Sequence, residues 1–326
     1  MKTRSSKYLI IGGTGSLGKA LINRLSCYNE VGIYSRDEAK QWIIKNEQKE
    51  NENLSFFVGD IRDYERVENV LTRYNPDIVI IAAALKQVDT CELSPEECIK
   101  TNIKGPCNVI RAIEKNISLL KCSTVVMVST DKACEPVNIY GMSKATSEIM
   151  VTSRSSFFDN SKLKFIATRY GNVLDSRGSI IPLFKYQGRN SDNITLTHKN
   201  MTRFVMTLDE SVDLILEAIK SGISGEIWIP KLKAMKIIDL AEIYAELSGK
   251  DIKHISLRPG EKLDESLICT AESPRARDLG KYYALSPSHQ KIKGNLNFFN
   301  YKSSDDLMTK EELKCYLEKL GHLDLD

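Results

Sequence analysis

A chain of 326 residues, 42% hydrophobic and 27% charged, is long and apolar enough to bury one large core or two smaller ones, which excludes a disordered protein. The net charge is only +3 and no block of Lys or Arg stands out, so the composition excludes a nucleic-acid or polybasic membrane partner and favours a small molecule. The eight cysteines form no CxxC pair and no Cys/His cluster at zinc spacing, which predicts reduced thiols and no metal site. The apolar runs are too short for a signal peptide or a membrane span, so we expect a soluble, cytoplasmic protein.

The first half of the chain alternates short apolar runs with helix-patterned segments, which is typical of a parallel sheet with helices on both faces. We expect strands at residues 8–11, 31–34, 54–58, 77–84, 124–129 and 164–170. We expect helices at residues 16–27, 37–47, 63–74, 94–116 and 138–154. The predicted fold class is therefore α/β, a Rossmann-type doubly wound parallel sheet.

After Gly171 the pattern loosens, because Gly, Pro, Asn and Asp become frequent. A mixed series of helices and strands is expected at 180–187, 194–198, 208–220, 225–230, 236–249 and 254–258. We therefore expect a nucleotide-binding Rossmann domain at 1–172 and a smaller mixed α/β region, mainly for substrate binding, at 173–326. Elements of the two parts are expected to interleave.

The first expected strand runs directly into the sequence GGTGSLG, which places Gly12, Gly15 and Gly18 at a strand-to-helix turn. Such glycines permit a tight turn, let the backbone approach a pyrophosphate and seat the helix on the sheet, while the helix N-terminus faces the phosphates. A glycine triplet alone is a weak signal, but this one follows a strand and opens an amphipathic helix. The loop therefore predicts a dinucleotide-binding site.

The end of the second expected strand indicates which dinucleotide is bound. An acid normally holds the free 2′-hydroxyl of NAD at this point, whereas this chain reads Tyr-Ser-Arg-Asp at 34–37. Arg36 can bind a 2′-phosphate with its planar guanidinium, and Ser35 and Lys40 can add donors, so NADP is favoured over NAD. The alternative is an ordinary basic helix start that is capped by Asp37.

The fifth expected strand delivers Ser129 and Thr130 at its carboxyl end, the edge at which open parallel sheets bind ligands. Tyr140 and Lys144 follow at i and i+4 on the next helix, so both side chains lie on one face. A lysine ammonium there stabilises tyrosinate, so we expect it to lower the phenol pKa from about 10 towards the operating pH and to hold the nicotinamide ribose.

These features together resemble the extended short-chain dehydrogenase/reductase superfamily. Within it, the chain is similar to the UDP-N-acetylglucosamine 4,6-dehydratases of polysaccharide biosynthesis, especially the short, soluble, inverting type. The similar blocks are SRDEAK (35–40), AAALKQVDTCELSPEECIKTNI (82–103), STDKACEPVNIYGMSK (129–144), TRYGNVLDSRGSIIPLF (168–184), MTRF (201–204) and LRPGEKLDE (257–265). The resemblance implies NADP as cofactor, UDP-N-acetylglucosamine as substrate and a homo-oligomer, either a dimer or a hexamer.

The resemblance also implies which residues form the site. The cofactor set adds to the glycines, Ser35, Arg36 and Lys40 the residues Thr14, Ser16, Leu17, Asp60, Ile61, Ala82, Ala83, Ala84, Lys86, Asn102, Ser129, Tyr140 and Lys144, with Asp60 and Ile61 flanking the adenine. The substrate set is Lys86, Thr130, Tyr140, Asn172, Arg177, Arg203, Arg258 and Glu261, in which the arginines suit a diphosphate. The chain departs from the family at Cys134 and Glu135, where smaller residues are expected.

A dehydratase must move two sets of protons. If Tyr140 takes the C4 hydroxyl proton while the C4 hydride goes to NADP, the 4-ketone acidifies the C5 hydrogen and water can leave from C6. We expect Lys132 to be the base at C5 and Asp131 the acid at C6, with Thr130 completing the catalytic set. Burial and the nearby cation Lys144 are expected to lower the Lys132 pKa, whereas Asp131 raises it, so the pair titrates as a unit. Inversion at C5 would give UDP-2-acetamido-2,6-dideoxy-β-L-arabino-hex-4-ulose for surface-glycan or glycoprotein sugars.

The residues leave other interpretations open. A nucleotide-sugar 4-epimerase also needs Tyr140 and Lys144 but has no use for an Asp-Lys pair, and a 4,6-dehydratase can retain the configuration at C5. A non-enzymatic NADP-sensing regulator would not need the complete Ser/Thr, Tyr and Lys set. The pair at 131–132 can also be a strand-end salt bridge that only shapes its loop.

Overall fold

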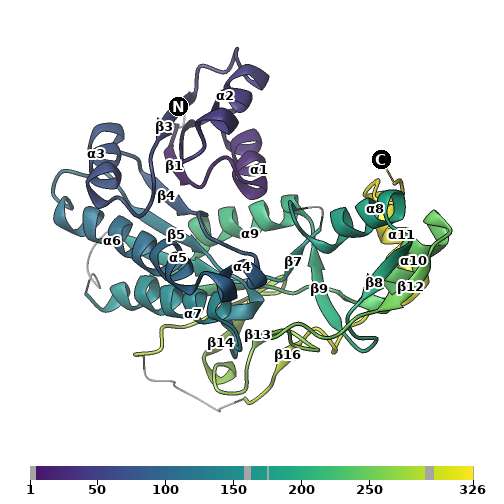
Figure 1. The fold of residues 1–326 in the computed structure, drawn as a ribbon. Helices are drawn as coiled ribbons and strands as arrows, with labels where there is room; N and C mark the ends of the chain where they lie inside the picture. The colour runs from purple at the N-terminus through teal and green to yellow at the C-terminus, as the bar shows by residue number, and fades with distance from the viewer. Residues whose placement is uncertain (1–4, 158–162, 175, 291–296, 326) are drawn as a thin grey trace.

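A computed structural model describes residues 5–157, 163–174, 176–290 and 297–325. Residue 175, in the block 168–184, lies outside the described residues, as do residues 1–4 of the amino-terminal run. The central element is a nine-stranded sheet with the order β14-β15-β10-β6-β5-β4-β1-β2-β3 (Figure 1). Its strands are β1 (Lys7–Ile11), β2 (Glu30–Ser35), β3 (Leu54–Val58), β4 (Ile78–Ile81), β5 (Thr124–Val128), β6 (Lys164–Thr168), β10 (Ile227–Pro230), β14 (Ala276–Asp278) and β15 (Tyr282–Leu285).

The sheet is parallel from β3 to β10 and antiparallel only where β15 and β14 join it. Its first six strands follow the Rossmann order 3-2-1-4-5-6, which confirms the predicted fold class. Ile11 at the end of β1 pairs with Tyr34 of β2 and with Ile81 of β4, so the carboxyl ends of these strands are level. Ligands bind at this edge in such sheets, where the strand order reverses between β1 and β4.

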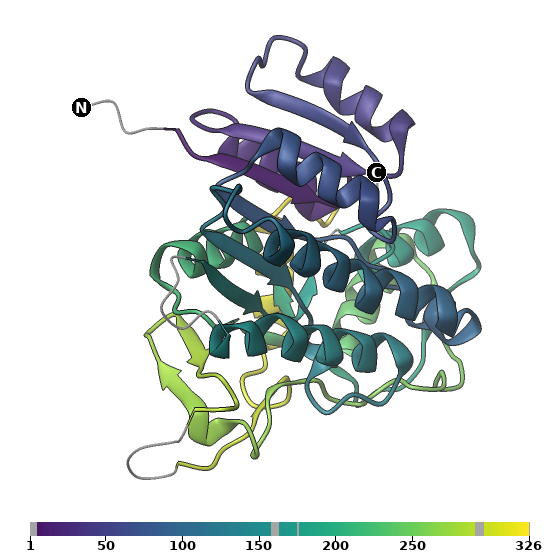
Figure 2. The same ribbon diagram turned by 90° about the vertical axis from the view of Figure 1, so that its left-hand side faces the viewer.

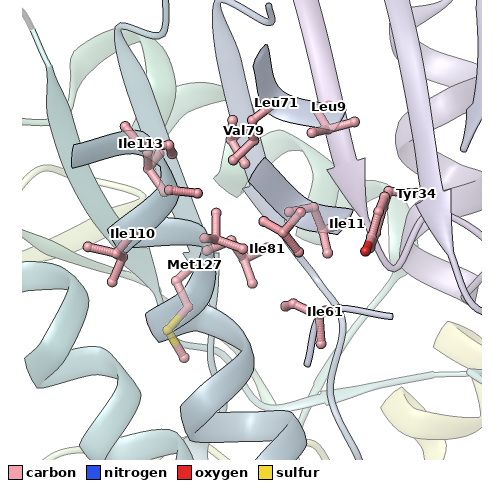
Figure 3. Close-up of a cluster of buried hydrophobic side chains, with 14 of the residues drawn as sticks. Leu9, Ile11, Tyr34, Ile61, Leu71, Val79, Ile81, Ile110, Ile113 and Met127 are labelled. Carbon is pink, nitrogen blue, oxygen red and sulfur yellow. The ribbon is translucent and has the colours of Figure 1, made fainter. Parts of the chain in front are cut away.

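Helices cover both faces of the sheet (Figures 1 and 2). On one face α3 (Tyr64–Tyr74), α6 (Gly105–Lys115) and α7 (Ile139–Thr152) pack on the side chains shown in Figure 3, which include Leu9 and Ile11 of β1. On the other face α1 (Ser16–Leu25), α2 (Glu38–Glu47) and α9 (Leu208–Ser221) pack on Ile10 and its neighbours. Because successive side chains of a strand point to opposite faces, β1 contributes to both cores.

The helix expected at 94–116 is present as one continuous helical stretch, formed by α5 (Pro95–Ile99), a π-helical turn η1 (Lys100–Lys104) and α6. The short helix α4 (Val88–Leu93) precedes it, and the π-helical turn is the feature that was not expected. Pro106, in the first turn of α6, has no N–H to donate to the carbonyl oxygen of Asn102 four residues earlier. That carbonyl accepts a hydrogen bond from the Ser147 hydroxyl of α7 instead, so the π-helical turn contacts α7 directly.

The rest of the chain forms a smaller mixed region, seen at the right of Figure 1. Its main core lies between α8 (Ile180–Asn190), β8 (Asn193–Leu196), α10 (Ile237–Ser248), β12 (Asp251–His254) and α11 (Lys310–Lys319). Two further sheets join β7 (Asn172–Val173), β9 (Thr202–Met206) and β11 (Ala234–Lys236), and β13 (Ser266–Ile268) with β16 (Tyr301–Lys302). The 3-10 turns are η2 (Asp131–Ala133), η3 (Ser153–Ser156) and η4 (Ser273–Arg275). Of the segment expected at 254–258, only His254 lies in a strand, as the last residue of β12.

The main sheet continues across the expected division at residue 172, because β10, β14 and β15 all come from the carboxyl-terminal half. The division into residues 1–172 and 173–326 therefore stays a prediction about function and does not describe two separate cores. In the described part of the chain, no helix has both the length and the apolar character needed to cross a membrane.

Candidate active site

A cavity of about 510 Å³ opens at the carboxyl ends of β1, β4, β5 and β6. The predicted site residues that line it are Gly12, Gly15, Ser16, Leu17, Gly18, Ala82, Ala84, Lys86, Ser129, Thr130, Asp131, Lys132, Tyr140, Lys144, Asn172, Arg177, Arg258 and Glu261. Segments from both halves of the chain thus meet in one cavity. Its dimensions and its mixed polar and apolar walls are those of a site for small molecules.

The glycine loop at one end of the cavity has no room for side chains. Gly12 has a φ of +93°, and a Cβ atom there would lie 2.6 Å from the backbone nitrogen of Ala83. A Cβ atom on Gly18 would lie 2.3 Å from the carbonyl oxygen of Gly13, because α1 packs directly on the loop. Gly15 occupies the N-cap of α1 and places no side chain over the helix N-terminus. The loop therefore fits the pyrophosphate of a dinucleotide, as the sequence predicts.

The side chains at the end of β2 already have partners. Arg36 is exposed and its Nη1 atom lies 3.6 Å from Asp60, while Lys40 pairs with Asp37. Asp37 also accepts a hydrogen bond from the Lys40 backbone nitrogen, so it is the helix cap that the alternative interpretation expected. Ser35 is buried and accepts a hydrogen bond from Gln41. Within the described residues, none of these side chains belongs to the cavity wall.

Some residues of the implied cofactor set lie in the protein interior instead. Ile61 is 4% exposed and packs in the core shown in Figure 3, so the expectation that it flanks an adenine is not supported. Asn102 is 1% exposed; its side chain accepts from the Leu85 nitrogen at 2.8 Å and donates to Ser143 Oγ at 3.0 Å. Asn102 thereby fixes the segment after β4 to α7. Thr14 and Ala83 also stand behind the cavity wall.

Tyr140 and Lys144 extend from α7, which Asn138 caps by accepting a hydrogen bond from the Gly141 nitrogen at 2.8 Å. Both side chains are buried at the cavity, and Lys144 Nζ donates to the carbonyl oxygen of Val128 at 2.5 Å. Burial lowers the pKa of Lys144 to about 8. Burial also raises the pKa of Tyr140 to about 12, although the Lys132 ammonium acts in the opposite direction. The lowered phenol pKa that we expected from Lys144 is therefore not present in this arrangement.

Asp131 and Lys132 belong to a cluster of three charged groups. Lys132 Nζ lies 3.2 Å from Asp131 Oδ1 and 2.9 Å from Glu265 Oε1. Asp131 and Glu265 are each 1% exposed. Thr130 donates its hydroxyl hydrogen to Asp131 Oδ1 at 2.9 Å. Within the described residues the second oxygens of both carboxylates, Asp131 Oδ2 and Glu265 Oε2, are buried without a hydrogen-bond partner.

The two carboxylates of this cluster determine the pKa of Lys132. Burial lowers the pKa of Lys132, but the Asp131 and Glu265 carboxylates outweigh it and raise that pKa above its usual range. Lys144, which we expected to lower the Lys132 pKa, is not among the groups that determine it; besides burial, Arg203 is the group that lowers this pKa. Burial raises the pKa of the Asp131 carboxyl, and Glu265 adds to this effect. The Glu265 pKa is lowered, because Lys132 and Arg203 outweigh its burial. The cluster thus favours an ammonium, an ionised Glu265 and a protonatable Asp131.

Arg203, which we expected to contact UDP, is not among the described residues that line the cavity. It is buried, and its Nη1 atom donates to the carbonyl oxygens of Thr202 at 2.7 Å and Leu263 at 2.9 Å. Its Nε atom lies 3.9 Å from Glu265. These contacts use the guanidinium to hold residues 262–265 in place, and the expected UDP contact stays a prediction.

Gly141 brings α7 against the turn that carries the cluster. A Cβ atom on Gly141 would lie 2.2 Å from the carbonyl oxygen of Lys132. Only a glycine lets Tyr140, its neighbour on α7, approach the Asp131-Lys132 turn this closely. The sequence interpretation used the Tyr and Lys of YGMSK and overlooked this glycine. It also overlooked Glu265, although that residue ends the quoted block LRPGEKLDE.

The other expected substrate contacts surround the open side of the cavity. Lys86 Nζ lies 3.4 Å from Ser176 Oγ, and burial lowers the pKa of Lys86. Arg177 and Arg258 are exposed, and Arg258 Nη1 pairs with Asp89 at 3.3 Å. Asn172 is half-buried at the start of β7. These cations can bind an anionic ligand that extends from the buried cluster towards solvent.

The comparisons with known proteins agree with this geometry. The family described as "Polysaccharide biosynthesis protein" matches residues 8–287. The UDP-glucose 4-epimerase of Rickettsia bellii (strain OSU 85-389) is 41% identical over 285 residues, which cover 85% of this chain and 82% of that protein. The UDP-N-acetylglucosamine 4,6-dehydratase (inverting) of Campylobacter jejuni subsp. jejuni serotype O:23/36 (strain 81-176) is 42% identical over 284 residues, which cover 86% of this chain and 82% of that protein.

A solved structure extends the similarity to almost the whole chain. The X-ray structure of Pen from Bacillus thuringiensis has a TM-score of 0.89 at 35% sequence identity, and the match covers 98% of each chain. The sequence matches and this structural match include the glycine loop, the tyrosine helix and the region that follows them. The chain therefore belongs to the polysaccharide biosynthesis protein family, a branch of the extended short-chain dehydrogenase/reductases.

Proposed function

We propose that this protein is a UDP-N-acetylglucosamine 4,6-dehydratase that inverts C5 and produces UDP-2-acetamido-2,6-dideoxy-β-L-arabino-hex-4-ulose. One observation carries the proposal: Asp131 and Lys132 line the cavity together with Tyr140, and Glu265 contacts Lys132 from outside the cavity wall. A dehydratase needs such a cluster to remove the C5 hydrogen and the C6 hydroxyl. The inverting dehydratase of Campylobacter jejuni, 42% identical, supports the same choice.

In the first step Tyr140 accepts the proton of the sugar C4 hydroxyl. When bound, NADP supplies the acceptor for the C4 hydride and later returns that hydride to C6. Tyr140 has a pKa of about 12 in its buried position, so it needs cationic support when it loses its own proton. Lys132 already lowers that pKa, and Lys144 lies one helical turn along α7.

In the second step the cluster acts on C5 and C6. Transfer of one proton from Lys132 Nζ to Asp131 Oδ1, which are 3.2 Å apart, converts the ion pair into a neutral amine and a carboxylic acid. The amine is then the base for the C5 hydrogen, and the acid protonates the departing C6 hydroxyl. The raised pKa of Asp131 eases this transfer, whereas the raised pKa of Lys132, to which Glu265 contributes, opposes it, so the neutral amine is a minor form that the substrate draws on. Reprotonation of C5 from the other face gives inversion.

We propose NADP as the cofactor, held by the glycine loop and α1, with the 2′-phosphate at Arg36. The side chain of Arg36 is 53% exposed, and its pairing with Asp60 at 3.6 Å is loose enough to be exchanged for a phosphate. Ser35, the last residue of β2, precedes it directly, and Lys40 lies in the first turn of α2. Lys144 and Tyr140 would face the nicotinamide ribose.

The variant Arg36→Asp tests this cofactor choice. Loss of a charge-assisted hydrogen bond to phosphate costs roughly 1.5–3 kcal/mol. Affinity for NADP should therefore fall by about 10- to 100-fold, whereas NAD binding should hold or improve, as measured by calorimetric titration. Lys45→Asp, on the exposed side of α2, is the control for the change in charge. Equal losses for both dinucleotides would place the 2′-phosphate elsewhere.

The reaction itself is tested by the nuclear magnetic resonance spectrum of the product formed from UDP-N-acetylglucosamine. We expect a C6 methyl group, a C4 ketone and no net accumulation of reduced nicotinamide. Lys132→Ala should slow elimination by the ~10²–10⁴ typical of a lost general base. Tyr140→Phe should stop the reaction one step earlier, at C4.

The second candidate is a nucleotide-sugar 4-epimerase, which the 41% identical UDP-glucose 4-epimerase of Rickettsia bellii supports. An epimerase would use Tyr140 and Lys144 in the same way but leave the C6 hydroxyl in place. A product that keeps the C6 hydroxyl and has the opposite configuration at C4 would show that the protein is an epimerase. A methyl product with the original C5 configuration would instead select a retaining dehydratase.

We also propose a homo-oligomer, a dimer or a hexamer, and a cytoplasmic location, both from the family resemblance. Sedimentation equilibrium of the purified chain tests the first. A monomer at micromolar concentration would contradict it.

A further inference from the structure

Two cysteines from distant parts of the chain meet directly behind the charged cluster. Cys134 follows the turn η2, which carries Asp131 and Lys132, and Cys269 follows β13. Their sulfur atoms and one oxygen of Glu272 all lie within 4.8 Å of one another. No pattern in the sequence predicts this pair, because the two residues are brought together only by packing of β13 against η2.

The two thiols have unequal environments. Cys134 is 1% exposed and directs its thiol at Glu272 Oε2, 3.5 Å away. Cys269 is only partly buried. The contact with Cys134 lowers the pKa of Cys269 to about 7, whereas the same contact and burial raise the pKa of Cys134. An accessible thiolate beside a buried thiol is the arrangement of a reactive and a resolving cysteine.

A metal ion fits these three groups poorly. Both carboxylate oxygens of Glu272 are taken by Arg169, whose Nη1 and Nη2 atoms donate to them at 2.8 Å each. The guanidinium charge would repel a divalent cation at this point. Zinc sites use four protein ligands, or three with an open position for water, whereas one of the three groups here is already engaged by Arg169. The surroundings therefore suit thiol chemistry better than metal binding.

We propose that Cys134 and Cys269 form a reversible disulfide that switches the enzyme off under oxidation by a peroxide. The Cys269 thiolate attacks one oxygen of hydrogen peroxide, the O–O bond breaks, and protonation of the leaving hydroxide gives water and a Cys269 sulfenic acid. The Cys134 sulfur then attacks the Cys269 sulfur and displaces the hydroxyl, which leaves as water with the Cys134 thiol proton. Two thiols and one peroxide thus give one disulfide and two molecules of water, and a dithiol reverses the change.

The bridge would alter the geometry of the site. A disulfide brings two sulfur atoms to about 2.05 Å. Closing the gap draws the end of η2 towards the end of β13; Lys132 belongs to η2, and Glu265 directly precedes β13. We expect this shift to disturb the 2.9 Å contact between the two charged groups. The glycine loop belongs to neither segment, so dinucleotide binding should be retained. This effect on turnover rests on the proposed dehydratase function.

The bridge is tested on the reduced full-length protein, exposed to hydrogen peroxide and then alkylated. Non-reducing digestion and mass spectrometry should find a peptide pair joined through Cys134 and Cys269, with two of the eight thiols lost and restored by dithiothreitol. Cys269→Ser and Cys134→Ser should each abolish the pair. Cys315→Ser, which removes an exposed thiol on α11, should leave it unchanged. Absence of the pair, its formation through other cysteines, or a stoichiometric metal ion that blocks alkylation would overturn the proposal.

The switch is tested by the rate of dehydration before oxidation, after oxidation and after re-reduction. We expect at least a tenfold fall that dithiothreitol reverses, with NADP affinity unchanged and with no fall in Cys269→Ser. A bridge that forms without any change of rate would overturn the switch. The mass measurement does not depend on catalysis, so a protein that forms the bridge but makes no dehydrated product would refute the proposed function and leave the dithiol standing.

Discussion

Lys132 has two acidic partners, and only one of them is its neighbour in the sequence. Asp131 lies 3.2 Å away and Glu265 lies 2.9 Å away, and both raise the Lys132 pKa against the effect of burial. The ammonium is therefore the favoured form, and a neutral amine arises only by redistribution of a proton within the cluster. The position of Glu265 consequently matters for the chemistry, although Glu265 does not line the cavity itself.

The variant Glu265→Gln tests whether Glu265 positions Lys132 for catalysis or only supports the fold. Removal of this carboxylate leaves Lys132 with one acidic partner, so the Lys132 pKa should fall and the limb of the pH-rate profile that reports it should move to lower pH. Because the ammonium also loses its second contact, kcat should fall by about 10- to 100-fold with little change in KM, a loss near the 1.5–3 kcal/mol of a hydrogen bond to a charged group. Steady-state kinetics across pH measure both effects.

Two variants control this experiment. Glu265→Asp keeps the charge on a shorter side chain and should recover part of kcat and the original pH limb. Asp264→Asn changes the adjacent carboxyl, which contacts Thr202 Oγ1 at 2.7 Å, and should leave the pH profile in place. A Glu265→Gln enzyme that loses stability but keeps the parent pH-rate profile would show that Glu265 only supports the fold.

At the level of elements, the approach of α7 to the turn η2 sets the distance between the two proton-transfer groups. Tyr140 lies in the first turn of α7, and Lys132 lies in η2. Gly141 makes the contact possible, since any Cβ atom would fall 2.2 Å from the Lys132 carbonyl oxygen. The two steps of the reaction therefore depend on one helix-to-turn contact.

Gly141→Ala should push η2 and α7 apart by enough to relieve that contact. We expect kcat to fall by at least tenfold, because misplacement of catalytic groups by about 1 Å can cost 10²-fold. NADP affinity should change little, since the glycine loop lies elsewhere. Met142→Ala, at the next and exposed position of α7, is the matched control and should behave like the parent. Parent-like turnover of Gly141→Ala would refute this role for the contact.

The elements and the site differ in how far the sequence could predict them. Strands β1 to β6 were predictable because each is a short apolar run beside helix-patterned residues. The helix at 94–116 was predictable in the same way, but its π-helical turn at 100–104 was not, because the effect of Pro106 on the hydrogen bonds of the preceding turn was not considered. Tyr140 and Lys144 share one helix, so their spacing revealed them. Glu265 and Cys269 reach the site only through long-range packing, for which the local pattern carries no signal.

For the whole molecule, Arg169 connects the site to the carboxyl-terminal region. It is 2% exposed and pairs with Glu148 of α7 at 2.6 Å and with Glu272 at 2.8 Å. It also donates to the carbonyl oxygen of Leu267 in β13 at 3.0 Å. Although burial raises the Glu272 pKa, the Arg169 guanidinium outweighs it and holds that pKa at about 2. This buried ion network fixes β13, and with it Glu265, against α7.

Arg169→Met should destabilise the protein by roughly 3–5 kcal/mol at neutral pH, because it leaves two buried carboxylates without their cation. Glu272 has a folded pKa below its unfolded value of 4.5, so its contribution to stability is present above pH 4.5 and is lost as the pH falls towards 2. The difference between the parent and the variant should therefore shrink in acid. Urea unfolding at neutral and acidic pH measures this.

Arg24→Met provides the comparison for that experiment. Arg24 pairs with Asp209 and Asp213 at the surface, where solvent screens such ion pairs and they contribute little to stability. A loss for Arg169→Met no greater than that for Arg24→Met, or a difference that grows in acid, would contradict the role given to the buried network.

The most direct test of the proposed reaction is the nuclear magnetic resonance spectrum of the product formed from UDP-N-acetylglucosamine in heavy water. If Lys132 removes the C5 hydrogen and C5 is reprotonated from the opposite face, the product is the 4-keto-6-deoxy sugar of L-arabino configuration. It should carry solvent deuterium at C5, whereas the hydrogen added at C6 should come from substrate C4. A product that keeps its C6 hydroxyl and carries no deuterium at C5 would contradict dehydration altogether.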